Sequence, residues 1–286
     1  MDGLLLGGIY LTLAMGFSMA YGVLHIIDFA VGEWIMLGAF LGFYFNKWTG
    51  LDPFLSLPLV FFFFAALGYV IQPILHRVMS GSMGRPVLMG LVFTFGLALI
   101  FSGLGQTIFG IFTHSIDTFV SGGSWSLEIG SFFISVPLVR LAGLIYAVAI
   151  IVVLSWLLKK TDFGLAVRAV AQNKEAASLM GVDVTKTASA VYAIYTGVSA
   201  MTGVFYGASL SFNAMMGPQL TVLAFFVVVL AGMGYLPGVP WAAFLLGFIQ
   251  SFFLIYLNPA YTLLAVFGVL YTILLISPTG MFRKGI

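Results

Sequence analysis

Long apolar runs are the feature that most constrains how this chain can fold. Several reach the roughly 20 residues that a helix needs to cross about 30 Å of hydrocarbon. They do not alternate as barrel strands do. The sequence therefore predicts an all-α, polytopic transmembrane helical bundle that forms a single domain over residues 1–286. The runs lie at about 3–24, 29–46, 54–75, 87–109, 140–158, 188–210, 218–235, 239–257 and 260–277. The second and seventh are short and contain glycine, so we expect eight or nine spans.

The composition supports a membrane protein and excludes several classes of site. Hydrophobic residues make up 62% of the chain and charged residues 7%, against about half and a quarter in soluble domains. The absence of cysteine excludes disulfides and thiolate metal sites. There is no G-x-x-x-x-G-K-(S/T) loop for ATP. The three histidines, His25, His76 and His114, have no metal-binding spacing. We therefore expect no catalytic centre, no metal, no cofactor and no nucleic-acid binding in this chain.

The basic residues of the short connections predict the orientation, because such residues favour the cytoplasmic side. The connection 159–187 carries five of the 11 basic residues, whereas 110–139 carries Asp117 and Glu128 but no Lys or Arg. We expect 159–187 to be cytoplasmic and 110–139 to be extracytoplasmic. Nine spans then place the N-terminus outside and the C-terminus inside. Further basic residues on the expected cytoplasmic side are Arg77, Arg85, Arg283 and Lys284, and Lys47 is the one exception on the outer side. Residues 1–24 have Asp2 and no basic residue, so we interpret them as a retained helix and not a signal peptide.

The charged insert 159–187 predicts an amphipathic helix outside the bilayer. Thr161 or Asp162 can cap its start and Gly181 can end it, which gives about five turns, with a break near Asn173. Helical spacing places Arg168, Gln172 and Glu175 on one face and Leu165, Ala169, Ala176 and Met180 roughly on another. Such a segment is either a solvated loop or a docking helix for a soluble partner. The apolar stripe favours docking.

The sequence of this insert also carries a family resemblance. Glu175-Ala176-Ala177-Ser178-Leu179-Met180-Gly181 reads E-A-A-x-x-x-G, which is similar to the cytoplasmic signature of ABC importer permeases. "TDFGLAVRAVAQNKEAASLMGVDV", "GLLLGGIYLTLAMGFSMAYGVLHIIDFAVGEWIMLGAF" and "VLAFFVVVLAGMGYLPGVPWAAFLLGFIQ" resemble segments of branched-chain amino acid (Liv-type) permeases, more the H subunit than the M subunit. The resemblance runs from about residue 3 to residue 280.

The resemblance implies an ATP-driven importer in a bacterial or archaeal inner membrane. Its partners would be a second, M-like permease chain, two cytoplasmic ATPases that bind ATP and Mg²⁺, and an extracytoplasmic solute-binding protein. This chain would not itself be an enzyme. Its coupling helix would sit in a groove of the ATPase, and the coupling residues would be Arg168, Gln172, Glu175, Ala176, Ala177, Gly181 and Asp183.

The implied substrates are branched-chain or other aliphatic amino acids. Val31 stands where the family usually has histidine, in a segment that reads Ala30-Val31-Gly32-Glu33. Urea, short amides and other small carboxylates therefore remain alternatives. An ATP-independent secondary transporter is a further alternative. It would need charge pairs or ion ligands in mid-span, and the spans hold almost none.

Polar residues within the runs are candidates for the translocation path: Gly32, Glu33, Trp34, Thr94, Asn213, Gly217 and Pro218. A carboxylate at mid-bilayer costs about 2.5–3.5 kcal/mol, so Glu33 should face protein or water. It is either a gate residue or part of an interfacial helix cap together with Asp28. Pro218 suits a first helical turn. The N–H groups of that helix start could receive a substrate carboxylate.

Overall fold

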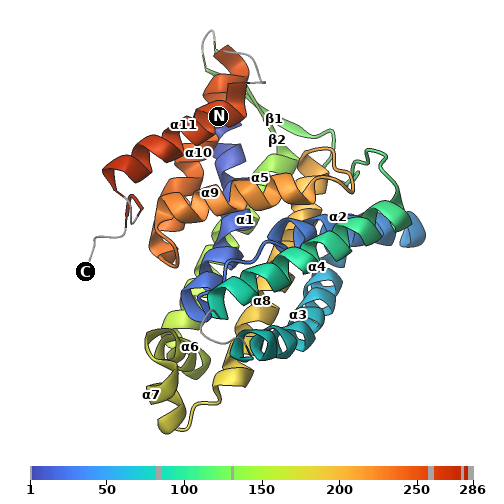
Figure 1. The fold of residues 1–286 in the computed structure, drawn as a ribbon. Coiled ribbons are helices and arrows are strands. Elements are labelled where there is room, and N and C mark those ends of the chain that lie inside the picture. Colours follow the sequence, from blue (N-terminus) through green and yellow to red (C-terminus); the bar gives the residue numbers. More distant parts are fainter. Residues whose placement is uncertain (1, 82–85, 130–131, 257–260, 278–279, 283–286) are drawn as a thin grey trace.

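The structure is a computed structural model that describes residues 2–81, 86–129, 132–256, 261–277 and 280–282 (Figure 1). Each predicted apolar run is a helix. The elements in chain order are α1 (Asp2–Leu24), α2 (Val31–Thr49), a 3-10 turn (Pro53–Ser56), α3 (Leu57–Ser80), α4 (Pro86–Phe109), β1 (Ser124–Ile129), β2 (Phe132–Pro137), α5 (Leu138–Lys160), α6 (Asp162–Gln172), α7 (Lys174–Leu179), α8 (Val184–Ser209), α9 (Gly217–Ala231), a second 3-10 turn (Leu236–Gly238), α10 (Val239–Tyr256) and α11 (Thr262–Ile276).

Six helical segments of the described chain are long and apolar enough to cross a membrane: α1, α3 with its preceding turn, α4, α5, α8 and α10 with its preceding turn. Helices α9 and α11 are apolar but have only 15 residues each. At 1.5 Å per residue they are about 22 Å long. The expected count of eight or nine spans is therefore not confirmed. Three of the basic residues used for the orientation, Arg85, Arg283 and Lys284, lie outside the described residues.

The least apolar of the long helices form the centre of the bundle, and more apolar ones surround them. Over their most apolar 18 residues, helices α1 and α8 have mean hydropathies of 1.6 and 1.3, and 94% and 78% of those residues are buried. The corresponding stretch of α4 has a mean hydropathy of 2.3, and only 11% of it is buried. A soluble protein would show the reverse order, since water penalises exposed apolar surface. Lipid does not, and this distribution supports a bundle whose outer face lies in hydrocarbon.

Small residues and side-chain hydrogen bonds hold the central helices together. Gly38 of α2 faces Ala200 of α8 so closely that a Cβ atom would overlap the Ala200 backbone. Gln72 of α3 accepts a hydrogen bond from the Ser189 hydroxyl of α8 at 2.7 Å. Tyr10 of α1 likewise donates to Gln250 of α10. Both features are typical of helix packing in membranes, where apolar attraction between helices is weak.

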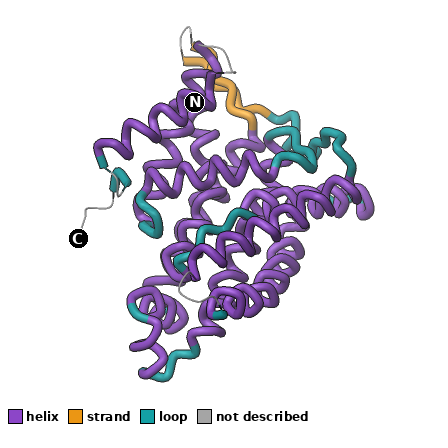
Figure 2. The backbone as a smooth tube through the Cα atoms, viewed as in Figure 1, coloured by secondary structure: helices purple, strands orange, loops and turns teal. Residues whose placement is uncertain are grey.

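The two connections that the sequence singled out lie at opposite ends of the bundle (Figure 2). Helices α6 and α7 are at one end, and strands β1 and β2 are at the other. The strands pair antiparallel, with Ser124 opposite Pro137. The predicted all-α class holds for the rest of the described chain, and this two-stranded hairpin is an addition to it. The described strands are rich in aromatic and β-branched residues, which favour strands over helices.

Candidate functional site

A break in the chain between α1 and α2 creates a buried polar junction. His25 ends α1 in the left-handed region, with a φ of 57°. Asp28, only 2% exposed, lies within the break. Its carboxylate accepts hydrogen bonds from the Tyr192 hydroxyl and from the Ala30 backbone N–H, both at 2.7 Å. A buried carboxylate needs such partners, because desolvation alone would be costly. Tyr192 belongs to α8, so the junction fastens the break to the central helix.

Two threonines from other helices hold the backbone of this break. The Thr94 hydroxyl on α4 accepts from the Phe29 N–H at 3.3 Å and lies 3.2 Å from the Ile27 carbonyl. The Thr221 hydroxyl on α9 accepts from the Gly32 N–H at 3.0 Å. The first N–H groups of a helix have no partner within the helix, so Thr221 satisfies one such donor of α2. Thr94 was predicted from the sequence. Thr221, Tyr192 and Asp28 were not among the predicted site residues.

Glu33 points at the start of α9. It is 1% exposed, and a Cβ atom at Gly217 would overlap its carboxylate. Its Oε2 atom has no hydrogen-bond partner among the described residues. The interfacial capping arrangement is realised only in part, because Asp28 accepts the Ala30 N–H whereas no side chain caps α2. The position that sequence analysis offered to a substrate carboxylate is thus next to a carboxylate of the chain itself.

Helices α2 and α9 meet here through glycine. A Cβ atom at Gly32 would overlap the Gly217 carbonyl oxygen and lie 2.7 Å from the Thr221 hydroxyl. Trp34, fully buried, packs edge-on against Phe101 with ring centroids 4.7 Å apart. The structure therefore brings together Gly32, Glu33, Trp34, Thr94 and Gly217 of the predicted path.

Further buried polar atoms without a hydrogen-bond partner in the described chain lie on the central helices. They are Ser18 Oγ on α1, Trp34 Nε1 on α2, and Tyr195 OH, Ser199 Oγ and Ser209 Oγ on α8. Trp34 and Tyr195 face the Asp28 carboxylate without reaching hydrogen-bond geometry. Buried polar atoms are normally satisfied by protein or by water. Their number here indicates a packed but polar interior between α1, α2 and α8.

The remaining predicted path residues belong to the connection between α8 and α9. The Asn213 side chain accepts from the Met215 N–H at 2.9 Å, which forms a local turn. Pro218 is exposed in the first turn of α9, as its type predicts. Phe212 exchanges two backbone hydrogen bonds with His114, at 2.8 and 2.9 Å. The segment 110–139 is therefore tied to this connection.

The charged insert forms a capped pair of short helices. The Thr161 hydroxyl accepts from the Gly164 N–H at 3.0 Å at the start of α6. Asn173 separates α6 from α7 and caps the latter through the Glu175 and Ala176 N–H groups, at 2.9 and 3.0 Å. Gly181 has a φ of 87°, which suits glycine after a helix end. The predicted start, break and end of this element agree with the structure.

Asp183 caps the start of α8, accepting the Lys186 backbone N–H at 3.0 Å and pairing with its ammonium group at 3.2 Å. These interactions with Lys186, the backbone hydrogen bond above all, lower the pKa of Asp183. The insert is therefore joined directly to the helix that carries Tyr192.

The face that the insert buries differs from the predicted one. Gly164, Val167, Val170 and Ala177 are buried, and a Cβ atom at Gly164 would overlap carbonyl groups of α5. Leu165, Ala176 and Met180, which the helical spacing placed on the apolar face, are exposed, and Ala169 is only half-buried. Of the predicted coupling residues, Arg168, Gln172, Glu175, Ala176, Gly181 and Asp183 are exposed and Ala177 is buried. Within α6 the contact of Gly164 with α5 sets the buried face, and beyond it the break at Asn173 ends the continuous helical spacing.

Two apolar residues at the tip of the insert stand out. Leu179 is 89% exposed and Met180 is 85% exposed. Adjacent apolar residues of such exposure on a charged loop are typical of a protein contact surface. Leu179 was not among the predicted coupling residues. The available signal was a second apolar side chain next to Met180, two positions before Gly181.

Comparisons with known proteins identify the family of this chain. Residues 1–276 match the family described as "Branched-chain amino acid transport system / permease component". The chain is 26% identical over 297 residues to the high-affinity branched-chain amino acid transport system permease protein LivH of Escherichia coli (strain K12), covering 99% of this chain and 94% of the relative. It is 25% identical to BraD, the corresponding permease protein of Pseudomonas aeruginosa, with the same coverage. It is 24% identical to the probable permease protein LivH of Methanocaldococcus jannaschii, covering 94% of this chain and 87% of the relative. No solved structure gives a significant match. The chain thus belongs to the family of permease components of branched-chain amino acid transport systems.

Proposed function

We propose that this chain is the membrane-spanning permease subunit of an ATP-driven importer for branched-chain and other aliphatic amino acids. The family match over residues 1–276 carries the proposal. The partners are an M-like permease chain, two ATPases that bind ATP and Mg²⁺, and an extracytoplasmic solute-binding protein. ATP hydrolysis belongs to the ATPases. The protein lies in the inner membrane, with 159–187 and the C-terminus cytoplasmic and 110–139 outside. Eight or nine crossings would require the shorter helices to cross as well.

The helices α6 and α7 form the coupling element that docks into the ATPase. Three features support this role: the caps at Thr161, Asn173 and Asp183, which fix the shape of the loop; the small, exposed Ala176; and the exposed Leu179 and Met180 at the tip. Burial of a leucine or methionine side chain in a partner groove contributes about 1.5–3 kcal/mol. Exposure of these side chains to water is unfavourable, whereas their burial in a groove of the ATPase would stabilise the complex.

Helix α8 transmits the movement of the loop to the polar junction. Asp183 fixes the loop to the start of α8, and Tyr192 lies eight residues after Val184 on the same helix, about 12 Å further along its axis. A tilt of α8 therefore changes the Tyr192–Asp28 hydrogen bond and the contact between α2 and α9. ATP and the loaded binding protein shift the equilibrium only if they bind one arrangement better than the other.

The junction of α2 and α9 is the gate in this proposal. The contact between Gly32 and Gly217 closes it, with Glu33 next to the start of α9. Separation of α2 from α9 would free the N–H groups of α9 for the substrate carboxylate and Glu33 for its ammonium group. The buried polar atoms without partners on α1, α2 and α8 would then face water.

Reconstitution tests the function. Proteoliposomes that hold this chain, the M-like chain, the ATPases and the binding protein are expected to take up labelled leucine only with ATP. Urea in a parallel experiment tests the alternative that Val31 suggests. Leucine uptake by the permease chains alone would identify a secondary transporter and refute the proposal.

A substitution at the loop tip tests the coupling role. Leu179→Glu is expected to abolish stimulation of the ATPases while the melting temperature stays unchanged, because the residue is almost fully exposed. Thr185→Glu, which adds the same charge at an exposed position in the first turn of α8, is the control. Equal ATPase activity in both variants would contradict docking at the tip.

The orientation can be measured by labelling, since the chain has no cysteine. Ser178→Cys should react with a membrane-impermeant maleimide only from the cytoplasmic side, and Ser115→Cys only from outside. Both residues are exposed. Labelling of both from the same side would reject the proposed topology.

A further inference from the structure

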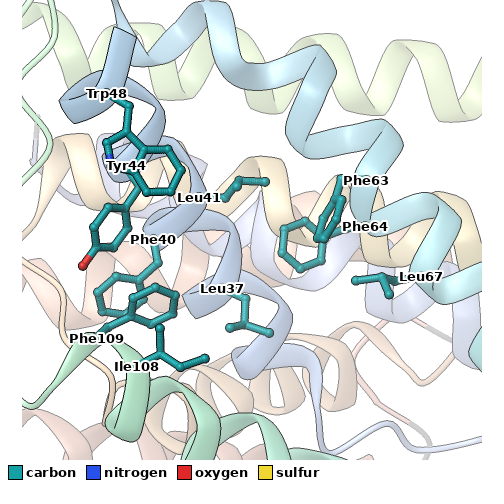
Figure 3. A pocket seen from close by; sticks show the side chains of 10 residues that line it. All are labelled: Leu37, Phe40, Leu41, Tyr44, Trp48, Phe63, Phe64, Leu67, Ile108 and Phe109. Atoms are coloured by element: carbon teal, nitrogen blue, oxygen red, sulfur yellow. The ribbon is translucent and has the colours of Figure 1, made fainter. Parts of the chain in front are cut away.

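An apolar groove of about 420 Å³ runs along the outer face of α2, between α3 and α4 (Figure 3). Leu37 and Leu41 of α2 form its half-buried floor. Phe63 of α3 and Ile108 of α4 line its walls and are 51% and 65% exposed. The ten residues that line it are all aliphatic or aromatic. The groove plays no part in the polar junction or the coupling loop.

The dimensions of the groove fit a hydrocarbon chain better than a helix. Along α2 it extends from Leu37 to Trp48, which is about 16 Å at 1.5 Å per residue. A helix of that length with a diameter of about 10 Å would occupy on the order of 1,200 Å³. The groove offers about a third of that volume, so a docked helix would bury only one face in it, whereas a narrower acyl chain fits within it. A narrow apolar slot parallel to a helix in the bilayer matches a single acyl chain.

One end of the groove carries a positive charge and two amphipathic rings. Trp48 is 78% exposed and lies beside Tyr44, with ring centroids 5.4 Å apart. The Lys47 ammonium group lies 5.8 Å from the centre of the Tyr44 ring. Lys47 is exposed and has no salt bridge within the described residues. Tryptophan and tyrosine favour the headgroup level of a bilayer, and lysine there attracts anionic lipid.

We propose that this groove is a binding site for one anionic phospholipid. An acyl chain lies on Leu37 and Leu41, and the phosphate is held by Lys47 beside Tyr44 and Trp48. This occupant gives a reason for Lys47, the exception to the charge distribution of the outer connections. The site is independent of the proposed transport function, because it shares no residue with the junction or the loop.

Native mass spectrometry of the purified permease assembly tests the headgroup. The assembly is titrated with dioleoyl phosphatidylglycerol or with dioleoyl phosphatidylcholine. We expect one phosphatidylglycerol to be retained in preference. Lys47→Gln should lower that preference about fivefold. Lys160→Gln removes an exposed charge at the far end of α5 and should have no effect. An equal loss in both variants would show general charge attraction and overturn the site.

A second pair of variants tests the groove itself. Ile108→Trp fills the groove from its rim and should weaken retention of both lipids. Ile100→Trp lies two turns earlier on α4, is 59% exposed and does not line the groove, so it should leave retention unchanged. Unaltered lipid retention in Ile108→Trp would overturn the proposal. A second outcome would also overturn it: the assembly retains neither lipid, and Ile108→Trp separates it into single chains. That result would mean that a second protein chain occupies the groove.

Discussion

Replacing Gly32 by alanine should destabilise the protein through a single methyl group at the contact of α2 with α9. The new Cβ atom would overlap the Gly217 carbonyl oxygen and lie 2.7 Å from the Thr221 hydroxyl, which accepts the Gly32 N–H. Both neighbours belong to a buried helix start, so the helices must separate. Overpacking of this kind costs about 1–3 kcal/mol, and a weakened hydrogen bond costs about 1 kcal/mol more.

Alanine also has a helix propensity about 1 kcal/mol better than glycine, which offsets part of this cost. The net loss of stability is therefore about 1–3 kcal/mol. Large domains lose about 2–4 °C of melting temperature per kcal/mol. We expect Gly32→Ala to melt roughly 3–10 °C below the unmodified protein when unfolding is followed by tryptophan fluorescence in detergent.

Gly96→Ala is the matched control, because a Cβ atom at Gly96 in α4 would meet no atom within 4 Å. It keeps the gain in propensity without the overlap, so it should melt at or slightly above the unmodified protein. If Gly32→Ala melted as high as Gly96→Ala, the close approach of α2 and α9 would be wrong.

Three further predictions concern the junction and the loop. Tyr192→Phe removes a donor to a buried carboxylate, which should cost about 1.5–3 kcal/mol; in a thermal double-mutant cycle with Asp28→Asn, strictly additive losses would contradict the hydrogen bond. The lowered pKa of Asp183 means that its cap is intact above the ordinary pKa of aspartate and is lost as pH falls through the folded-state value. Hydrogen exchange at the Lys186 backbone N–H, corrected for intrinsic rates, should therefore lose protection below about pH 4. The variant Asp183→Asn should show no such pH dependence. Glu175→Arg should leave the melting temperature nearly unchanged, since the residue is exposed, but should weaken co-purification of the ATPases, and undiminished co-purification would count against docking at this face.

The helices could be predicted from the sequence, but their places in the bundle could not. Every apolar run is a helix because lipid and a protein interior both require satisfied backbone groups. The same apolar residues suit lipid and core alike, so hydrophobicity does not say which face is buried. Helix α4 is more apolar than α8 and yet lies outside it. The surplus of serine, threonine and glycine in α8 was the available signal for its central position.

The candidate site was predictable only where local sequence determines it. Glycine and acidic residues marked the break before α2, and Thr161, Asn173 and Gly181 marked the ends of the loop helices. The contact of Thr221 with Gly32 joins residues 189 positions apart, and no local pattern announces it. The short distance in sequence from the end of α1 predicted an interfacial position for Glu33. In the structure, Glu33 is buried against the start of α9. The buried face of α6 was mispredicted because it is set by the contact of Gly164 with α5, which local periodicity does not reveal.

The hydrogen bonds between His114 and Phe212 connect the distal segment to the far end of α8, whose near end is fixed by Asp183. At 26 residues this helix is about 39 Å long, enough to cross the bilayer. If α8 moves as a rigid unit, as proposed, the segment at its far end and the loop at its near end are energetically coupled, and the coupling is reciprocal. A ligand that binds at the far end and raises the affinity of the loop for its partner by some factor must then itself bind more tightly, by the same factor, once that partner is docked.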